Sequence, residues 1–146
     1  MDEEKKTEST ITTLSKQGYA LLKSGKLRDA RAVFEEGYRL DADNGYILIG
    51  LGDTIRKSKE FSGSIPYYER ALTNDPENRF ALLGLGDAYR GLKNFKKCLE
   101  VWLRYIDNNP GDYSILTRIA DAYKKTNDRQ NAIKYYHLAL DAKQDN

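Results

Sequence analysis

Apolar residues recur along this chain at helical spacing, and the whole pattern returns every 34 residues. Its clearest copy is LLGLGDAYR at 82–90, and LIGLGDTIR at 48–56 is a near-copy. Looser copies lie at 14–22 and 116–124. Residues three, four and seven positions apart share one face of a helix, so each copy predicts a helix with an apolar face. Copies at one fixed period predict an array of repeats.

The period divides the chain into units, each of which predicts two helices joined by a short polar turn. The units are 11–44, 45–78, 79–112 and 113–146. A polar tail or cap at 1–10 precedes them, in which Ser9 or Thr10 is expected to cap the first helix after a frayed start. The expected helices are 11–24, 27–40, 45–58, 61–74, 79–92, 95–108, 113–126 and 129–142. The fold class is therefore all-α, an α-solenoid of antiparallel helix-turn-helix hairpins.

Small residues recur where the two helices of a hairpin are expected to cross. Helices approach most closely where both have little side chain, so we expect Gly18 to face Ala30 and Gly86 to face Cys98. An aromatic row would fill the wider space beyond. The predicted core comprises Leu48, Leu51, Tyr68, Leu82, Leu85, Tyr89, Trp102, Ile119, Tyr123 and Tyr136.

Composition narrows the function classes without adding a motif. Of 146 residues, 40% are hydrophobic and 32% are charged, and the net charge of +2 disfavours a nucleic-acid partner. A single cysteine excludes an internal disulfide and a zinc cluster. We expect no metal, no cofactor and no membrane segment. The N-terminus has no apolar run of the kind that signal peptides have, so a cytoplasmic protein is expected.

The repeated residues resemble the tetratricopeptide repeat family, whose period is 34 and whose pattern includes Leu-Gly, Tyr, an aromatic, Ala and Pro. Pro76 and Pro110 match the terminal proline, whereas Ala42 and Gln144 depart from it, and Leu replaces the usual Trp. The resemblance covers residues 11–146. It implies a right-handed superhelix in which the first helices line a concave face that binds peptides or partner helices.

The sequence shows no catalytic constellation, and an enzyme is not expected. His137 is the sole histidine, without partners that would make it a base or a ligand, so a structural or exposed role is expected. Cys98 stands in a row of small residues, which favours buried packing over a nucleophile. Gly84 and Gly86 fall inside a predicted helix rather than after a strand, which excludes a phosphate-binding loop.

The other face of the first helices is apolar in the two middle units and polar in the outer two. This pattern predicts the apolar centre of a peptide-binding groove at Tyr46, Ile49, Phe80 and Leu83, since an apolar cluster with a polar rim is typical of binding sites. The predicted groove comprises Tyr46, Ile49, Gly50, Asp53, Arg56, Phe80, Leu83, Gly84, Asp87, Arg90, Asp121 and Lys124.

Within this groove, Gly50 and Gly84 are expected to leave bare backbone and hence a recess. An aspartate row lies three residues before a basic row, so the two can pair along their own helices, at ~0.2–0.5 kcal/mol each. The pairs are Asp53–Arg56, Asp87–Arg90 and Asp121–Lys124. They would either form a solvated ladder or flank the ligand and fix its direction.

Three alternatives stay open. The apolar side chains could only pack against the neighbouring hairpin. The C-terminal edge, where Tyr136 and Leu140 keep the character of residues that receive another hairpin, could self-associate or contact a longer parent chain. RNA could bind along a basic edge, although an aspartate row lies inside it. That edge comprises Lys23, Arg56, Lys57, Arg90, Lys124 and Lys125.

Overall fold

The computed structural model describes residues 2–145, which form eight α-helices and no strand. The helices are α1 (Glu3–Lys23), α2 (Leu27–Leu40), α3 (Gly45–Lys57), α4 (Phe61–Asn74), α5 (Arg79–Gly91), α6 (Phe95–Asn108), α7 (Tyr113–Lys125) and α8 (Arg129–Gln144). The predicted all-α class and its helix-turn-helix hairpins are confirmed. The bounds of α2, α4 and α6 are those expected from the sequence.

The first helix begins earlier than predicted. Asp2 is the N-cap of α1, and its side chain accepts a hydrogen bond from the Lys5 amide at 2.9 Å. Two glutamates in the first turn suit the positive end of the helix dipole. The expected cap at Ser9 or Thr10 and the frayed start are therefore wrong, because the polar residues at 3–10 are themselves helical.

The hairpin turns use equivalent residues in the left-handed region. In each, the amide three residues past the helix end bonds back to a carbonyl five residues earlier, as a Schellman motif does. The residues with positive φ are Gly25 (77°), Lys59 (66°), Lys93 (60°) and Asn127 (62°). Their spacing shows that the 34-residue period is also the period of the backbone.

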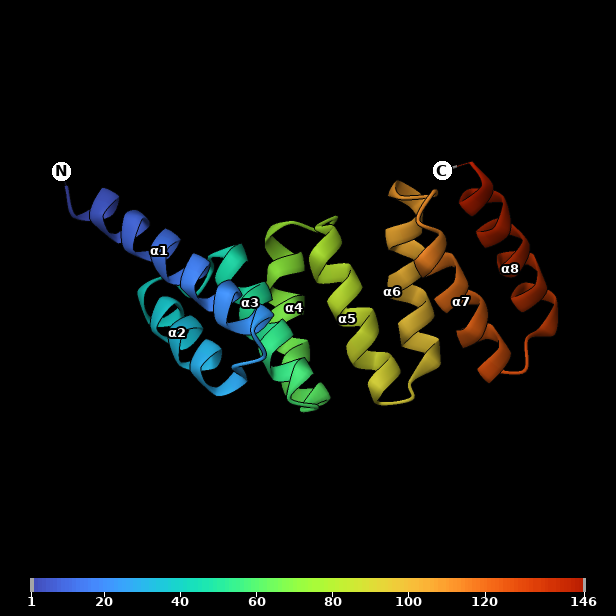
Figure 1. Ribbon diagram of the computed structural model, residues 1–146, viewed down its shortest axis with the longest axis horizontal. Helices are drawn as coiled ribbons and strands as arrows, with labels where there is room; N and C mark the ends of the chain where they lie inside the picture. The colour runs from blue at the N-terminus through green and yellow to red at the C-terminus, as the bar shows by residue number, and fades with distance from the viewer. Residues whose placement is uncertain (1, 146) are drawn as a thin grey trace. The chain divides into compact units, whose positions relative to one another are not determined.

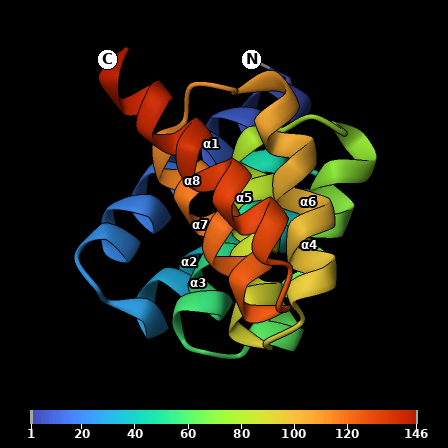
Figure 2. The same ribbon diagram turned by 90° about the vertical axis from the view of Figure 1, so that its right-hand side faces the viewer.

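The chain forms two compact units, Met1–Gly84 and Leu85–Asn146, and the boundary falls inside α5. In the first unit, α1 packs on α2 and α3 on α4, while α2 and α3 join the two hairpins (Figure 1). In the second unit α7 lies between α6 and α8, and the turned view of Figure 2 shows α7 and α8 side by side. Within residues 2–145, no helix combines the length and the apolar character that crossing a membrane requires.

In the first unit, each hairpin is closed by an aromatic ring that lies against bare backbone. A Cβ built on Gly18 or Gly50 would come within 2.5 or 2.3 Å of the Phe34 ring. Tyr68 has the same relation to Gly52 and Gly84, at 2.7 and 2.4 Å. Real Cβ atoms do not approach carbon so closely, so only glycine fits at these places. Each ring is held between two consecutive first helices.

The predicted pairing of small rows is therefore wrong. A Cβ on Gly18 would meet Phe34 rather than Ala30, and one on Gly86 would meet the Trp102 ring, 2.0 Å from Nε1, rather than Cys98. The glycines make room for large rings of the second helix. This contact buries more apolar area than two small residues could, which offsets the low helix propensity of glycine.

Most of the predicted core is confirmed. The residues of it that are buried are Leu48, Leu51, Tyr68, Leu82, Leu85, Trp102 and Ile119. Tyr89, Tyr123 and Tyr136 are only half-buried. Lys97 Nζ lies 5.6 Å from the centre of the Tyr89 ring, and the Tyr123 ring stacks on Tyr135 at 5.5 Å. A tyrosine at the edge of a core keeps its polar end near water or charge, which apolar periodicity alone does not predict.

Candidate binding surfaces

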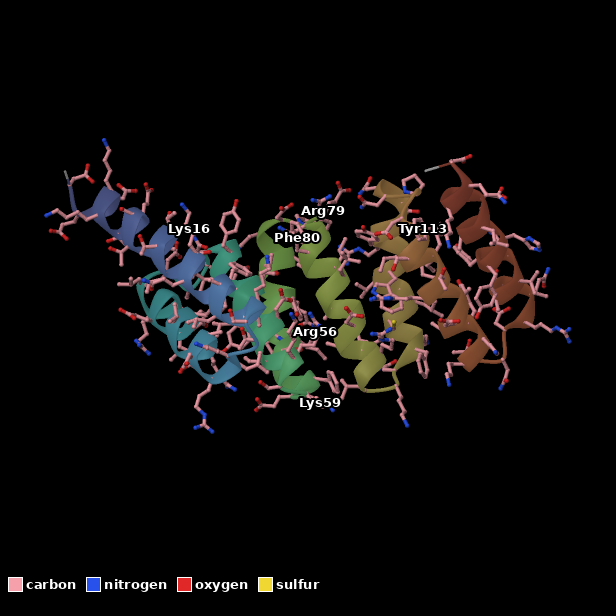
Figure 3. The ribbon with its side chains drawn as sticks, viewed as in Figure 1. Lys16, Arg56, Lys59, Arg79, Phe80 and Tyr113 are labelled. Carbon is pink, nitrogen blue, oxygen red and sulfur yellow. The ribbon has the colours of Figure 1, made fainter. Side chains whose placement is uncertain are left out.

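A pocket of about 560 Å³ opens in the unit Met1–Gly84, between α3, the end of α4 and the start of α5. Tyr46 and Phe80 line it with 71% and 56% of their surface exposed, and Ile49 forms part of its wall with 6% exposed. The guanidinium of Arg79 lies 4.8 Å from the centre of the Phe80 ring, at the start of α5 (Figure 3). The polar rim of this pocket comprises Asn44, Asn74, Asp75 and Asn78.

Tyr19 brings α1 to the same pocket, although sequence analysis did not include it. Its hydroxyl donates to the backbone carbonyl oxygen of Tyr46 at 2.7 Å, and its ring meets the Phe34 ring edge-on at 5.0 Å. Burial raises the pKa of Tyr19. The sequence did contain a signal for Tyr19. In the first repeat, Tyr19 stands where the other repeats have aspartate, and Phe34 stands where they have tyrosine or tryptophan, whose rings have a polar atom.

Asp53 also lines the pocket, and it belongs to a polar cluster with Tyr68 of α4. The Tyr68 hydroxyl donates to Asp53 Oδ1 at 2.5 Å, and Arg56 donates from Nε to the Tyr68 oxygen at 3.0 Å. Arg56 also lies 3.4 Å from Asp53, so that predicted pair is present. Burial raises the pKa of Asp53, against the lowering effects of Tyr68 and Arg56. Burial, and then the charge of Asp53, raises the pKa of Tyr68.

The glycines of the predicted groove do not provide a recess. Gly50 and Gly84 are buried, and the rings of Phe34 and Tyr68 occupy the space beside them. That expectation is wrong because an absent side chain leaves room for packing within the repeat as readily as for a ligand. Leu83 is half-buried. Of the four residues expected at the apolar centre, Tyr46 and Phe80 are the exposed ones.

The remaining groove residues belong to the unit Leu85–Asn146. Asp87 and Arg90 pair as predicted, at 3.2 Å, and Asp87 is also 3.3 Å from Arg118. Asp121 accepts a hydrogen bond from the hydroxyl of Tyr136. Tyrosine–aspartate bonds of this kind join the two helices of a hairpin, as Tyr68 and Asp53 do in the other unit.

A second pocket, of about 740 Å³, lies in this unit and is strongly basic. It opens among the end of α5, the turn before α6, and α7. Its basic side chains are Arg90, Lys93, Arg118, Lys124 and Lys125, and the other residues that line it are Phe95, Asp121, Ala122 and Asn127. The sequence suggested only part of this set, as a basic edge. Arg118 was the missed signal, since it replaces Gly50 and Gly84 in its row.

Cys98 and His137 are the two residues that the sequence raised as candidates for chemistry. Cys98 is buried, and burial raises the pKa of its thiol to about 12. His137 is exposed on α8. Among the residues that the structure describes, no group of three or more His, Cys, Asp or Glu side chains is placed to hold a metal ion.

The outer face of α8 keeps apolar residues open to solvent. Leu140 is 57% exposed, whereas Leu72, its equivalent in α4, is 8% exposed. Tyr136 is half-buried beside a hollow of about 550 Å³ that Tyr113 and Lys143 also line.

Comparison with known proteins agrees with these observations. Sequence profiles described as tetratricopeptide repeat match residues 15–79, 56–113 and 113–146. No curated protein was found to match the chain in sequence. A crystal structure of MamA is 24% identical, with a TM-score of 0.88, and the alignment covers 92% of this chain and 79% of MamA. MamA from Desulfovibrio magneticus RS-1 is 20% identical, with a TM-score of 0.86 and coverages of 92% and 76%. At these identities the likeness concerns the fold.

Proposed function

Because the chain belongs to the tetratricopeptide repeat family, we propose that it binds a peptide or helix of a partner protein, anchored in the pocket of Tyr46, Ile49 and Phe80. The family consists of protein-interaction and assembly scaffolds, and at that level the chain is such a scaffold. The observation that carries the finer proposal is the exposure of two large aromatic side chains on one pocket.

Their sequence neighbours indicate that these side chains are not simply part of the core. Ile47 and Ala81 directly follow Tyr46 and Phe80 on α3 and α5, and both are 0% exposed. Packing between hairpins therefore uses the adjacent helix face. Exposed aromatic residues cost solvation free energy unless a partner covers them, and such residues are the usual anchors of protein interfaces.

The pocket fits an apolar side chain presented on a peptide backbone. An apolar group would lie between Tyr46 and Phe80, over Ile49. Around it, three asparagines each use part of their amide in hydrogen bonds within the chain, and their remaining donors and acceptors suit the N–H and C=O groups of a peptide. Asp75 adds negative charge at the rim, which favours a partner segment with a lysine or arginine near its apolar anchor.

A selection from a random peptide library displayed on phage tests this proposal. The wild-type chain serves as bait, and the Tyr46→Ala/Phe80→Ala chain serves as counter-selection. The expected result is a consensus with one apolar anchor, whose affinity falls by ~2 kcal/mol or more in the double variant, the loss that truncated central anchors show. Far-ultraviolet circular dichroism should be unchanged, since both side chains are largely exposed.

Thr12→Ala/Ser114→Ala is the matched control, because Thr12 and Ser114 are the equivalent residues of the outer repeats. It should bind the selected peptides as the wild type does. A consensus without an apolar residue, or peptides that bind the double variant equally well, would contradict the proposal.

Self-association through α8 is a second candidate, favoured by the exposure of Leu140. Stacking on α1 of another copy does not suit this face, because α1 has Lys16 where Gly50 and Gly84 accept an aromatic ring (Figure 3). The candidate is therefore an α8-to-α8 contact. Light scattering should show a dimer that Leu140→Glu abolishes, and a wild-type chain that stays monomeric at high concentration would exclude it.

A further inference from the structure

The basic pocket of the unit Leu85–Asn146 has no role in the binding of an apolar anchor. It has five basic side chains and one carboxylate in its lining, in a chain whose net charge is only +2. Charge of one sign gathered in a concavity raises the local concentration of the opposite charge. We propose that this pocket binds an acidic segment of a partner protein, with two or more Asp or Glu carboxylates, independently of the apolar pocket.

The two arginines of the pocket are held in position by a single carboxylate. Arg90 and Arg118 lie 3.2 and 3.3 Å from Asp87, and the Arg90 guanidinium lies 5.7 Å from the centre of the Trp102 ring. Both arginines remain partly exposed. Two positive groups that share one negative group keep an excess of positive charge. A guanidinium that is already fixed loses less entropy when it binds a carboxylate.

A purely structural explanation accounts for only part of this cluster. Lys124 and Lys125 lie in the last turn of α7, where positive charge stabilises a helix end. Arg118 lies in the middle of α7, at the place that Gly50 and Gly84 hold in α3 and α5. Packing at that place requires no cation. Arg118 thus adds charge to the pocket where the repeat itself needs none.

The size and lining of the pocket favour a peptide over a small anion or RNA. About 740 Å³ exceeds what one phosphate or carboxylate fills, so a segment with several charges suits it better. RNA-binding surfaces use exposed aromatic rings to stack bases, whereas Phe95 in this lining is half-buried. Asp121 and the nearby Asp87 would also repel a continuous phosphate backbone more than a peptide with spaced carboxylates.

Titration of the full chain with a hexaglutamate peptide at low ionic strength tests the proposal. Trp102 is the only tryptophan and lies beside Arg90, so its fluorescence is a built-in reporter, with calorimetry as a second readout. The expected result is saturable binding that weakens as salt rises. Lys124→Gln/Lys125→Gln should reduce affinity about three- to tenfold, and Arg118→Gln should do so by a similar factor, whereas Arg118→Lys should retain most of it.

The matched control is Lys23→Gln/Lys57→Gln, which removes the same charge from the last turns of α1 and α3. It should bind hexaglutamate within about twofold of the wild type, since these lysines are not in the pocket. No saturable binding, or an equal loss in the control, would overturn the proposal by showing that the charge is dispersed.

An oligouridylate that binds more tightly than hexaglutamate and depends on the same pocket residues would overturn it in favour of RNA. The Tyr46→Ala/Phe80→Ala chain should bind hexaglutamate normally, and loss in that chain would also contradict an independent site.

Discussion

The two units of the molecule use the same hairpin but differ at the residue that meets the aromatic ring of the preceding second helix. In Met1–Gly84, Phe34 and Tyr68 each lie between two glycines. One glycine is on the first helix of the same repeat, and the other is on the first helix of the next repeat. In Leu85–Asn146, Trp102 lies against Gly86, and the place of the second glycine is taken by Arg118. Arg118 lies beside Asp87 instead.

This difference shows how one repeat can present two kinds of surface. Where glycine accepts the ring, the first helices need no polar group at that place, and the exposed large apolar residues of α3 and α5 are Tyr46 and Phe80. Where Arg118 stands instead, its guanidinium pairs with Asp87 and lines the basic pocket. The 34-residue period is the same in both units, and the row of Gly50, Gly84 and Arg118 distinguishes the apolar surface from the charged one.

Placing the same side chain at this row in both units should give the largest contrast. Gly84→Leu would put a Cβ 2.4 Å from the Tyr68 ring, and overpacking of this kind lowers the free energy of unfolding by ~1–3 kcal/mol or more. Arg118→Leu removes only a partly exposed ion pair, so a loss of ~1 kcal/mol or less is expected. Urea unfolding of the two variants measures both values. Equal losses would show that the ring contact is no tighter in one unit than in the other.

The sequence predicted the hairpins well because helix periodicity and repeat period reinforce each other. It did not predict where the glycines pack, because a row of small residues signals a close approach without naming the partner. Gly50 illustrates this: on sequence alone it was a recess for a ligand, and in the structure it accepts Phe34.

The candidate site was predicted in part for the same reason. Tyr46 and Phe80 break the repeat pattern and could be found, whereas Tyr19 enters the pocket through a hydrogen bond between α1 and α3, and its only sequence signal is the replacement of the aspartate of its row by tyrosine.

The tyrosine–aspartate bonds should differ in strength between the units. Tyr68→Phe removes the donor at 2.5 Å from the half-buried Asp53, which keeps its contact with Arg56, and an acceptor that loses a donor away from water costs ~1–3 kcal/mol. Tyr136→Phe removes the equivalent bond to the exposed Asp121, where water can replace the hydroxyl, so a loss below ~1 kcal/mol is expected. Thermal unfolding of both variants checks this, and a greater loss for Tyr136→Phe would reverse the assignment of burial.

The smallest expected effect concerns pH. Burial raises the pKa of Asp53, so folding favours its protonated form, and the stability from this group is lost as pH rises through the folded-state pKa. The free energy of unfolding of the wild type, relative to that of Asp53→Asn, should therefore increase as the solution is acidified from neutral pH. Urea titrations of both chains at several pH values measure the difference. A difference that decreases on acidification would mean that Tyr68 and Arg56 outweigh burial.

A nuclear magnetic resonance titration of the ¹⁵N-labelled chain with a peptide selected on it tests whether the two pockets are separate binding surfaces. Chemical shifts are expected to change at Tyr46, Ile49, Asn78 and Phe80 on addition of an apolar-anchored peptide, while those of Arg118, Lys124 and Lys125 stay unchanged. Hexaglutamate should give the opposite map. Apolar-peptide shifts confined to α8, or a single set of residues that responds to both ligands, would contradict two separate binding surfaces on one repeat scaffold.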